Sequence, residues 1–468
     1  MIYRWHHPPS DPAPERLSRS GPTDDSLRRK LTFGAAAICI FTSQLDFFAL
    51  SLALPRMAQE LDVSTTNLHW VISGYMIAVG AFLVPAGRLG DIFGRKRILI
   101  VGLTIFGLAS LGGGLSPNAN TVIAFRLVQG IGAGTLVPLS IAVITDAFPH
   151  ERNKQVIGNA LGVGALAMAL GPLFGGVAVE LIGWRVILLT NVSLSAIAIA
   201  LVTVGVRESR DPTAARSIDL PGLFMLSGGI SAVTYAVDRA NAWRVTEVVG
   251  MAAIGLLLLG GFVLRERHAK NPMIKLTLFR NTCFVVTTTM AMIANVAFSV
   301  AIFSITLYLQ QVKGYSPAIA GVIFLAATVA GTVAGPLTGR LGARYNIPRT
   351  IAAATALGAV GLLLLSIEGG LGPYLPGLAL VGLCFGIGYQ MATVGTQTIV
   401  KTRLVGEASG VTLTIVTGLA GLGVAAIAML IEVSSTMSDL GGGIATSLRW
   451  IAVTSALVSA AIVGIWRT

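Results

Sequence analysis

Charged residues are scarce in this chain of 468 residues. Asp, Glu, Lys and Arg together make up 12% of it, whereas a soluble domain carries about 25%. Apolar residues make up 54%, and the mean hydropathy is +0.78. A soluble core cannot bury that much apolar surface, because soluble chains of this length divide into domains with polar surfaces. The composition excludes a soluble enzyme and a disordered protein, and it predicts a chain that crosses a membrane many times.

Cysteine is scarce too, and common enzyme motifs are missing. Cys39, Cys283 and Cys384 all lie inside apolar runs, where cysteine acts as a small core residue, so we expect no disulfide scaffold, redox pair or metal site. The sequence has no Walker loop, no HExxH motif and no Gly-rich phosphate loop. We therefore expect neither enzyme activity nor a cofactor, and uphill transport would have to use an ion gradient. The net charge of +12 is spread between apolar runs, so no nucleic-acid partner is expected.

Long apolar runs dominate the sequence after the first thirty residues. A spanning helix needs about 20 apolar residues. Fourteen runs meet that length, near 31–54, 67–86, 98–116, 121–147, 154–182, 186–206, 218–237, 246–264, 283–308, 317–337, 349–367, 372–397, 406–431 and 449–466. The sequence predicts an all-α membrane protein of fourteen spans, preceded by a polar, mostly disordered tail over 1–30.

The distribution of Lys and Arg predicts the orientation. With the N-terminus inside, 26 of the 33 basic residues fall in inner segments and 6 in outer ones. Such a bias places both termini in the cytoplasm. Arg outnumbers Lys 26 to 7, which is typical of a GC-rich bacterial gene. We expect a multi-pass protein of the bacterial cytoplasmic membrane.

A short repeat divides the chain into two halves. The loop at 87–97 reads GRLGDIFGRKR and the loop at 339–349 reads GRLGARYNIPR. Similar halves are the mark of repeat-built transporters. The two copies lie eight spans apart, although six-helix halves would put them six apart, so two helices have been inserted. We expect a six-helix bundle over 31–206, a linker over 207–280 with an inserted hairpin (218–237 and 246–264), and a second six-helix bundle over 281–468.

Five motifs in order carry a family resemblance. They are the loop at 87–97, the stretch RLVQGIGAG at 126–134, Gly158 with GPLFGG at 171–176, Leu45-Asp46 with Ala53-Leu54-Pro55, and Tyr308-Leu309-Gln310 with Gly314, Ser316, Pro317 and Gly321. In these motifs the chain resembles the major facilitator superfamily, in its fourteen-helix drug:proton antiporter branch. The resemblance implies the major facilitator fold and multidrug or antibiotic efflux.

Asp46 and Arg126 are the two charged residues that we place well inside predicted spans. At 1.5 Å per residue, Asp46 lies roughly 22 Å into the membrane from its inner side. Arg126 lies roughly 9 Å from the outer edge of a core about 30 Å thick, which is the same depth. Unpaired charges there are costly, so we expect the two to pair in at least one state. Two interpretations stay open: proton coupling, in which loss of the contact lets Asp46 take a proton, or a permanent structural ion pair.

Two glycine-containing stretches are candidates for conformational roles. In the loop at 87–97, Gly87 and Gly94 permit tight turns, and the resemblance implies that Asp91 caps the span starting near Glu407, with Arg95, Lys96 and Arg97 beside it. A plain positive-inside anchor also explains the basic residues. In the fifth span we expect an antiporter hinge that seals the cavity, although ordinary small-residue packing explains it too; its residues are Gly158, Gly171, Pro172, Gly175 and Gly176.

The substrate cavity is the least determined feature. Its candidates are polar residues in otherwise apolar spans, where contact with a neighbouring helix is an equal alternative: Gln44, Tyr75, Asn191, Asn295, Tyr389, Gln390 and Gln397. His69 is expected to face water at the outer surface. An apolar cavity with few polar groups suits lipophilic and, beside a carboxylate, cationic molecules.

These features together predict a proton-coupled exporter that rocks two bundles around a central site, with sodium coupling left open as an alternative. Its partners would be a small-molecule substrate and the lipid bilayer, and we expect a monomer. A metabolite uniporter or symporter is the first alternative, which the antiporter stretch disfavours. A non-transporting membrane receptor is the second, and the buried charges disfavour it because a scaffold gains nothing from them.

Overall fold

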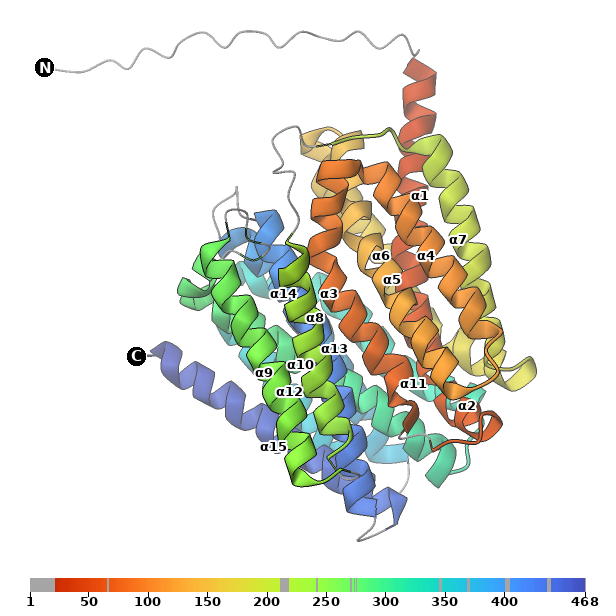
Figure 1. Ribbon diagram of the computed structural model, residues 1–468, viewed down its shortest axis with the longest axis vertical. Coiled ribbons are helices and arrows are strands. Elements are labelled where there is room, and N and C mark those ends of the chain that lie inside the picture. Colours follow the sequence, from red (N-terminus) through yellow and green to blue (C-terminus); the bar gives the residue numbers. More distant parts are fainter. Residues whose placement is uncertain are drawn as a thin grey trace, which may run out of the picture.

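The computed structural model describes residues 22–64, 67–210, 219–240, 243–269, 272, 274, 276–344, 347–367, 371–399, 405–435 and 439–467. These segments fold into helices joined by short turns, and no strand occurs among them. Figure 1 shows the helices running side by side along the long axis of the molecule.

The first part of the chain forms one bundle. Its helices are α1 (Pro22–Ser51), the short α2 (Leu54–Glu60), α3 (Trp70–Phe93), α4 (Arg95–Gly114), α5 (Ala119–Ala147), α6 (His150–Leu181) and α7 (Arg185–Gly205). Local signals explain their ends: the side chain of Asn118 accepts from Thr121 N and caps α5, and Gly94 ends α3 at a φ of 115°, which only glycine adopts without strain. Helix α1 begins at Pro22, so part of the segment expected to be mostly disordered is helical.

The second bundle follows a similar pattern. Its helices are α10 (Thr282–Leu307), α11 (Pro317–Arg344), α12 (Ile347–Leu365), α13 (Leu371–Ile399), α14 (Val405–Ser435) and α15 (Leu440–Arg467). A 3-10 turn η2 (Leu276–Arg280) precedes α10, and a π-helical turn η3 (Tyr308–Val312) extends it. Helix α10 is the most enclosed of the candidate spans.

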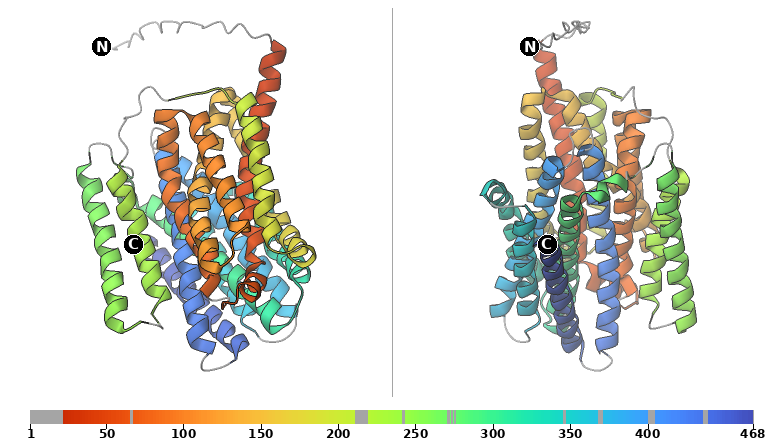
Figure 2. Two further views of the ribbon diagram at one scale, coloured as in Figure 1. Left: turned by 45° about the vertical axis from the view of Figure 1, so that its right-hand side comes forward. Right: turned by 90° about the vertical axis from the view of Figure 1, so that its left-hand side faces the viewer.

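A helical hairpin lies between the two bundles in sequence and at the edge of the molecule in space (Figure 2). Its helices are α8 (Leu220–Asp238) and α9 (Val245–His268). Leu226 and Ile230 of α8 pack with Ile77 of α3 and Ala408 of α14. The outer side of α9 exposes large apolar residues such as Leu256 and Leu257, as expected for a surface that faces lipid.

The number of spans agrees with the sequence. Within the described part of the chain, 12 helices are long and apolar enough to cross a membrane, and Pro221–Val237 and Arg349–Leu365 are two shorter apolar helices. The prediction of an all-α membrane protein with fourteen helices is confirmed. The exact division at 31–206, 207–280 and 281–468 stays a prediction.

Small residues bring the two bundles into close contact. A Cβ on Gly80 of α3 would lie 2.7 Å from Gly418 Cα of α14, and a Cβ on Gly321 of α11 would lie 2.4 Å from Pro172 O of α6. Real Cβ atoms do not approach so closely, so only glycine allows these helix pairs to pack at this distance. The α3–α14 and α6–α11 pairs form the main interface between the bundles.

The two ends of the molecule differ in charge and are named accordingly. The end where α1 begins carries Arg88, Arg95, Lys96, Arg97 and Arg207 and is called the basic end. Arg207 Nη2 lies 2.9 Å from an Asp25 carboxylate oxygen, so this ion pair joins the segment after α7 to the start of α1. The other end, which carries α2 and the loop before α7, is called the opposite end.

Candidate functional site

A buried ion pair joins α1 to α5 inside the first bundle. Asp46 is 0% exposed and Arg126 is 1% exposed. Arg126 Nη1 donates to Asp46 Oδ2 over 2.7 Å. The two charges therefore lie in direct contact, at the common depth that helix counting gives them. Their role in proton coupling stays a prediction.

Two amides complete the shell around the Asp46 carboxylate. Gln129 Nε2 donates to Oδ1 over 3.1 Å, and Asn191 Nδ2 donates to the same oxygen over 2.6 Å. Both side chains are buried. A buried charge is tolerated only when it is paired and its remaining lone pairs accept hydrogen bonds. Three donors from α5 and α7 meet this requirement for the Asp46 side chain.

Arg126 is fixed by further contacts with α3 and α5. Its Nε donates to the Val71 carbonyl over 2.9 Å, and its Nη1 also donates to Gln129 Oε1 over 2.6 Å. Its guanidinium carbon lies 4.0 Å from the centre of the Tyr75 ring, which is a cation–π contact. The ion pair is thus held by contacts from four helices, α1, α3, α5 and α7, and the Tyr75 ring covers one face of the cation.

A cavity lies beside the ion pair and between the two bundles. It contains about 770 Å³ of empty space, including its opening to solvent. Its walls come from α1, α3, α5, α10, α13 and α14, and they include the predicted residues Gln44, Tyr75, Asn295 and Tyr389. The structure therefore brings these four polar side chains to one space.

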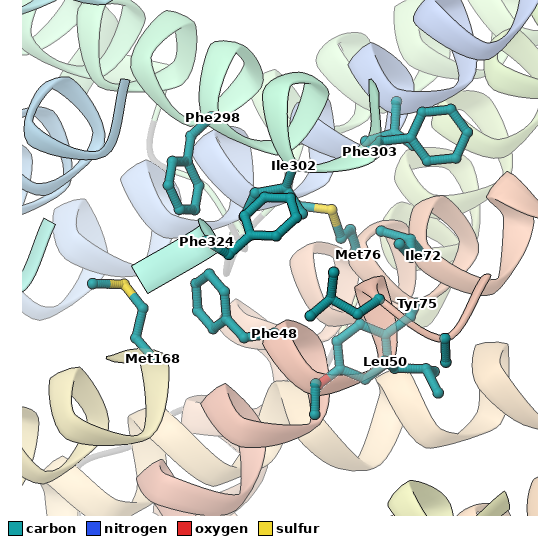
Figure 3. Packing of buried hydrophobic residues seen from close by; sticks show 14 of the residues in the cluster. Phe48, Leu50, Ile72, Tyr75, Met76, Met168, Phe298, Ile302, Phe303 and Phe324 are labelled. Carbon is teal, nitrogen blue, oxygen red and sulfur yellow. The ribbon is translucent and has the colours of Figure 1, made fainter. Parts of the chain in front are cut away.

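Aromatic rings form much of the cavity wall. Phe298 and Phe385 stack at 4.3 Å between ring centres with 13° between their planes, and Phe48 meets Phe298 edge-on at 5.9 Å. Figure 3 shows Phe48 and Phe298 approaching each other from different helices. Phe47 lines the same space. The cavity is thus apolar and aromatic with a few polar groups, which is typical of small-molecule sites.

Other residues predicted for the cavity lie elsewhere. Asn191 bonds to Asp46 and is not among the residues that line the cavity. Gln390 is half-buried but does not line it either. The side chain of Gln397 lies outside the described residues. His69, expected to face water, is buried with Nδ1 2.9 Å from Ser73 Oγ, because the turn before α3 folds against the bundle.

The stretch around the turn between α3 and α4 bonds to its own bundle and to the linker that follows α7. Arg95 donates from Nε and Nη2 to Asp91 Oδ1 over 3.0 and 2.9 Å and also pairs with Asp146 at the end of α5. Lys96 N donates to Glu208 Oε1 over 3.1 Å, and Arg97 Nε lies 3.5 Å from the same carboxylate. Asp91 is expected to cap the helix that starts near Glu407. The side chain of Glu407 lies outside the described residues, so that contact stays a prediction.

The small-residue stretch on α6 packs against both bundles. A Cβ on Gly175 would lie 2.3 Å from Ala49 O of α1, and a Cβ on Gly176 would lie 2.3 Å from Pro317 O of α11. A Cβ on Gly171 would likewise lie too close to Phe48. A Cβ on Gly158 would have nothing within 4 Å, and α6 continues through Pro172. The stretch thus joins the bundles through Gly176, whereas Gly158 makes no close contact.

Several contact residues are absent from the sequence-based candidates. Gln129 belongs to the quoted motif at 126–134, three residues after Arg126, so helical spacing alone places both on one face of α5. Asp146 lies in the last turn of α5 and Glu208 follows α7, and no sequence motif links either residue to Arg95, Lys96 or Arg97. The aromatic cavity wall gives no sequence signal, because phenylalanines occur throughout apolar spans.

Comparison with known proteins identifies the family. The model of the Major Facilitator Superfamily matches residues 36–427. The chain belongs to the Major Facilitator Superfamily. The predicted family and its fold are thereby confirmed, and members of this superfamily are transporters rather than enzymes.

Relatives with curated names are 28% to 34% identical to this superfamily member over the aligned residues. The "Multidrug resistance protein Stp" of Mycobacterium tuberculosis (strain CDC 1551 / Oshkosh) is 31% identical, over 81% of this chain and 72% of its own. The "Tetracenomycin C resistance and export protein" of Streptomyces glaucescens is 28% identical, over 81% and 71%. The "Puromycin resistance protein pur8" of Streptomyces alboniger is 34% identical, over 69% and 64%.

Solved structures share the fold at low sequence identity. The POT family transporter PepTSo is 14% identical and superposes with a TM-score of 0.68, over 93% of this chain and 97% of that one. The nucleoside transporter NupG is 13% identical with a TM-score of 0.63, over 94% and 99%. These likenesses establish the fold alone.

Proposed function

We propose that this protein is a proton-coupled exporter of small lipophilic molecules, with Asp46 as the group that carries the proton. The observation that carries the proposal is the buried Asp46–Arg126 pair, which touches Tyr75, a residue of the cavity wall. A substrate in the cavity contacts Tyr75 and therefore acts on the side chain that covers Arg126. Displacement of Arg126 would remove the positive charge that contacts Asp46 among the described residues, and the acid would then take a proton.

The contacts between the bundles support an alternating-access cycle. The cavity lies between the bundles, and close glycine contacts join them toward the opposite end. Toward the basic end, Gly87 and Gly158 have nothing within 4 Å of an added Cβ. The positive-inside rule places the basic end in the cytoplasm. The cavity in this state would then be reached from the cytoplasm, which is the loading state of an exporter.

The names of the relatives support export of drug-like compounds. Resistance to tetracenomycin C, puromycin and several drugs is stated for three relatives that each match more than two thirds of this chain. The same relatives are bacterial, in agreement with a place in the bacterial cytoplasmic membrane. A monomer, with both termini in the cytoplasm, is part of this proposal.

Everted membrane vesicles test the coupling directly. Respiration acidifies their interior, and a drug:proton antiporter lets protons out when a substrate is added. We expect at least one of tetracenomycin C and puromycin to collapse the gradient in vesicles that contain the protein. Asp46→Asn should abolish this response, because the amide cannot carry a proton.

Matched variants separate the role of Asp46 from general damage. Glu247→Gln changes an exposed carboxylate at the start of α9 and should respond as the unaltered protein does. A full response in Asp46→Asn removes Asp46 from the mechanism. Uptake of the compounds without proton movement would indicate a uniporter, and proton movement in the same direction as the compound would indicate a symporter.

A further inference from the structure

The cavity presents no formal charge to its contents. None of the described residues that line it is charged. Asp46 and Arg126 lie behind this wall, because Tyr75 lines the cavity with the guanidinium 4.0 Å from its ring centre. Both oxygens of Asp46 already accept hydrogen bonds from Arg126, Gln129 and Asn191. A cation in the cavity would therefore lose its hydration without gaining a counter-charge.

The aromatic walls favour flat molecules. Phe298 and Phe385 are stacked nearly parallel, and Tyr389 lies 5.6 Å from Phe385 between ring centres at 35°. Phe48 stands edge-on to Phe298 from the other bundle. The faces and edges of these rings that line the cavity let a planar ring system pack offset against one ring and edge-to-face against another.

Aromatic walls also attract cations, so this attraction must be compared with the cost of removing a cation from water. A cation–π contact is weak compared with the penalty for removing a full charge from water into an apolar site. One face of the Tyr75 ring is, in addition, already occupied by Arg126. The balance therefore favours neutral ring systems over cations of the same shape.

We propose that the cavity binds flat, uncharged aromatic molecules and discriminates against permanent cations of equal shape. This inference names the substrate class of the exporter and so rests on the proposed function for its link to transport. This proposal replaces the expectation of cationic substrates. That expectation depended on the Asp46 carboxylate, which is enclosed by its own hydrogen-bond donors.

Two probes of nearly equal shape test the charge preference. Acridine is uncharged at mildly alkaline pH, whereas 10-methylacridinium carries a permanent positive charge on the same three rings. Displaceable binding of each radiolabelled compound is measured on the full-length protein purified in a neutral detergent, without any proton gradient. We expect acridine to bind about tenfold more tightly or better.

A ring variant tests the aromatic wall. Phe385→Leu removes one of the stacked rings and should weaken acridine binding roughly two- to tenfold. Phe93→Leu changes a half-exposed ring at the end of α3, away from the cavity, and should leave acridine binding unchanged. Equal binding of acridine to Phe385→Leu and to the unaltered protein would contradict the stacking.

The outcomes distinguish this inference from the proposed function. If 10-methylacridinium binds as tightly as acridine, or if neither compound binds, the inference is overturned whatever the vesicles show. If acridine is preferred but no compound moves protons in vesicles, the proposed coupling fails and the binding preference stands. The unaltered protein alone decides the charge preference, so misfolding of a variant cannot obscure it.

Discussion

Replacement of Arg126 by Met is the most informative perturbation of the buried ion pair. Met fills a similar apolar space but carries no charge and no donor. The variant loses the bonds from Arg126 to Asp46, to Gln129 and to the Val71 carbonyl. Asp46 keeps its two amide donors but loses the cation that it contacts.

The expected loss of stability follows from that geometry. Removing one partner of a buried ion pair costs about 3–5 kcal/mol, because the remaining charge is left uncompensated. Replacing both partners is much less harmful, since no charge then remains. We therefore expect Asp46→Asn/Arg126→Met to be more stable than Arg126→Met alone, with a coupling energy of about 2–3 kcal/mol between the sites.

Equilibrium unfolding in mixed micelles of SDS and a neutral detergent measures these differences. The unaltered protein, the two single variants and the double variant form a complete double-mutant cycle. Arg97→Met is the matched control, because the Arg97 side chain is 69% exposed and its bridge to Glu208 spans 3.5 Å. A surface pair of this kind contributes about 0–1 kcal/mol.

Additive effects would refute the reasoning. If the double variant loses the sum of the two single losses to within about 0.5 kcal/mol, the two side chains do not interact in the folded protein. If Arg97→Met is as harmful as Arg126→Met, the loss reflects general sensitivity to arginine replacement rather than burial of the pair.

Two further predictions concern the bundle interface and the carboxylate shell. Gly176→Leu should lower efflux rates at least tenfold in vesicles, because the leucine side chain would overlap Pro317 O and push α6 away from α11. Gly34→Leu is the control and should leave efflux unchanged, because a Cβ on Gly34 has nothing within 4 Å. Equal effects of the two variants would contradict close packing at Gly176. Asn191→Leu removes one donor to Asp46 and should impair proton-coupled efflux, while acridine binding stays within about twofold because Asn191 does not line the cavity. A selective loss of acridine binding would contradict that placement.

The sequence alone determined the architecture of this protein. Spanning helices require about 20 consecutive apolar residues, and this is a property of short segments that needs no knowledge of neighbours. The count of fourteen helices could therefore be made from composition and hydropathy. The depths of Asp46 and Arg126 could be obtained in the same way, because helix rise is constant.

Lateral position within the membrane was much harder to infer. Asn191 is a polar residue in an apolar span, as Asn295 is, and nothing local separates the two. The structure places Asn191 on Asp46 and Asn295 at the cavity wall. His69 likewise appeared to be a surface residue from its place before a span, yet the fold buries it.

Only the tertiary structure decided which side chains share a site. The cavity wall combines Phe48 of α1 with Phe298 of α10 and Phe385 of α13, which are far apart in the chain. Hydropathy reports how deep a residue lies but not which face of its helix meets which neighbour. That choice depends on the packing of small residues such as Gly80 and Gly176 between helices, a property of pairs of segments that no single segment contains.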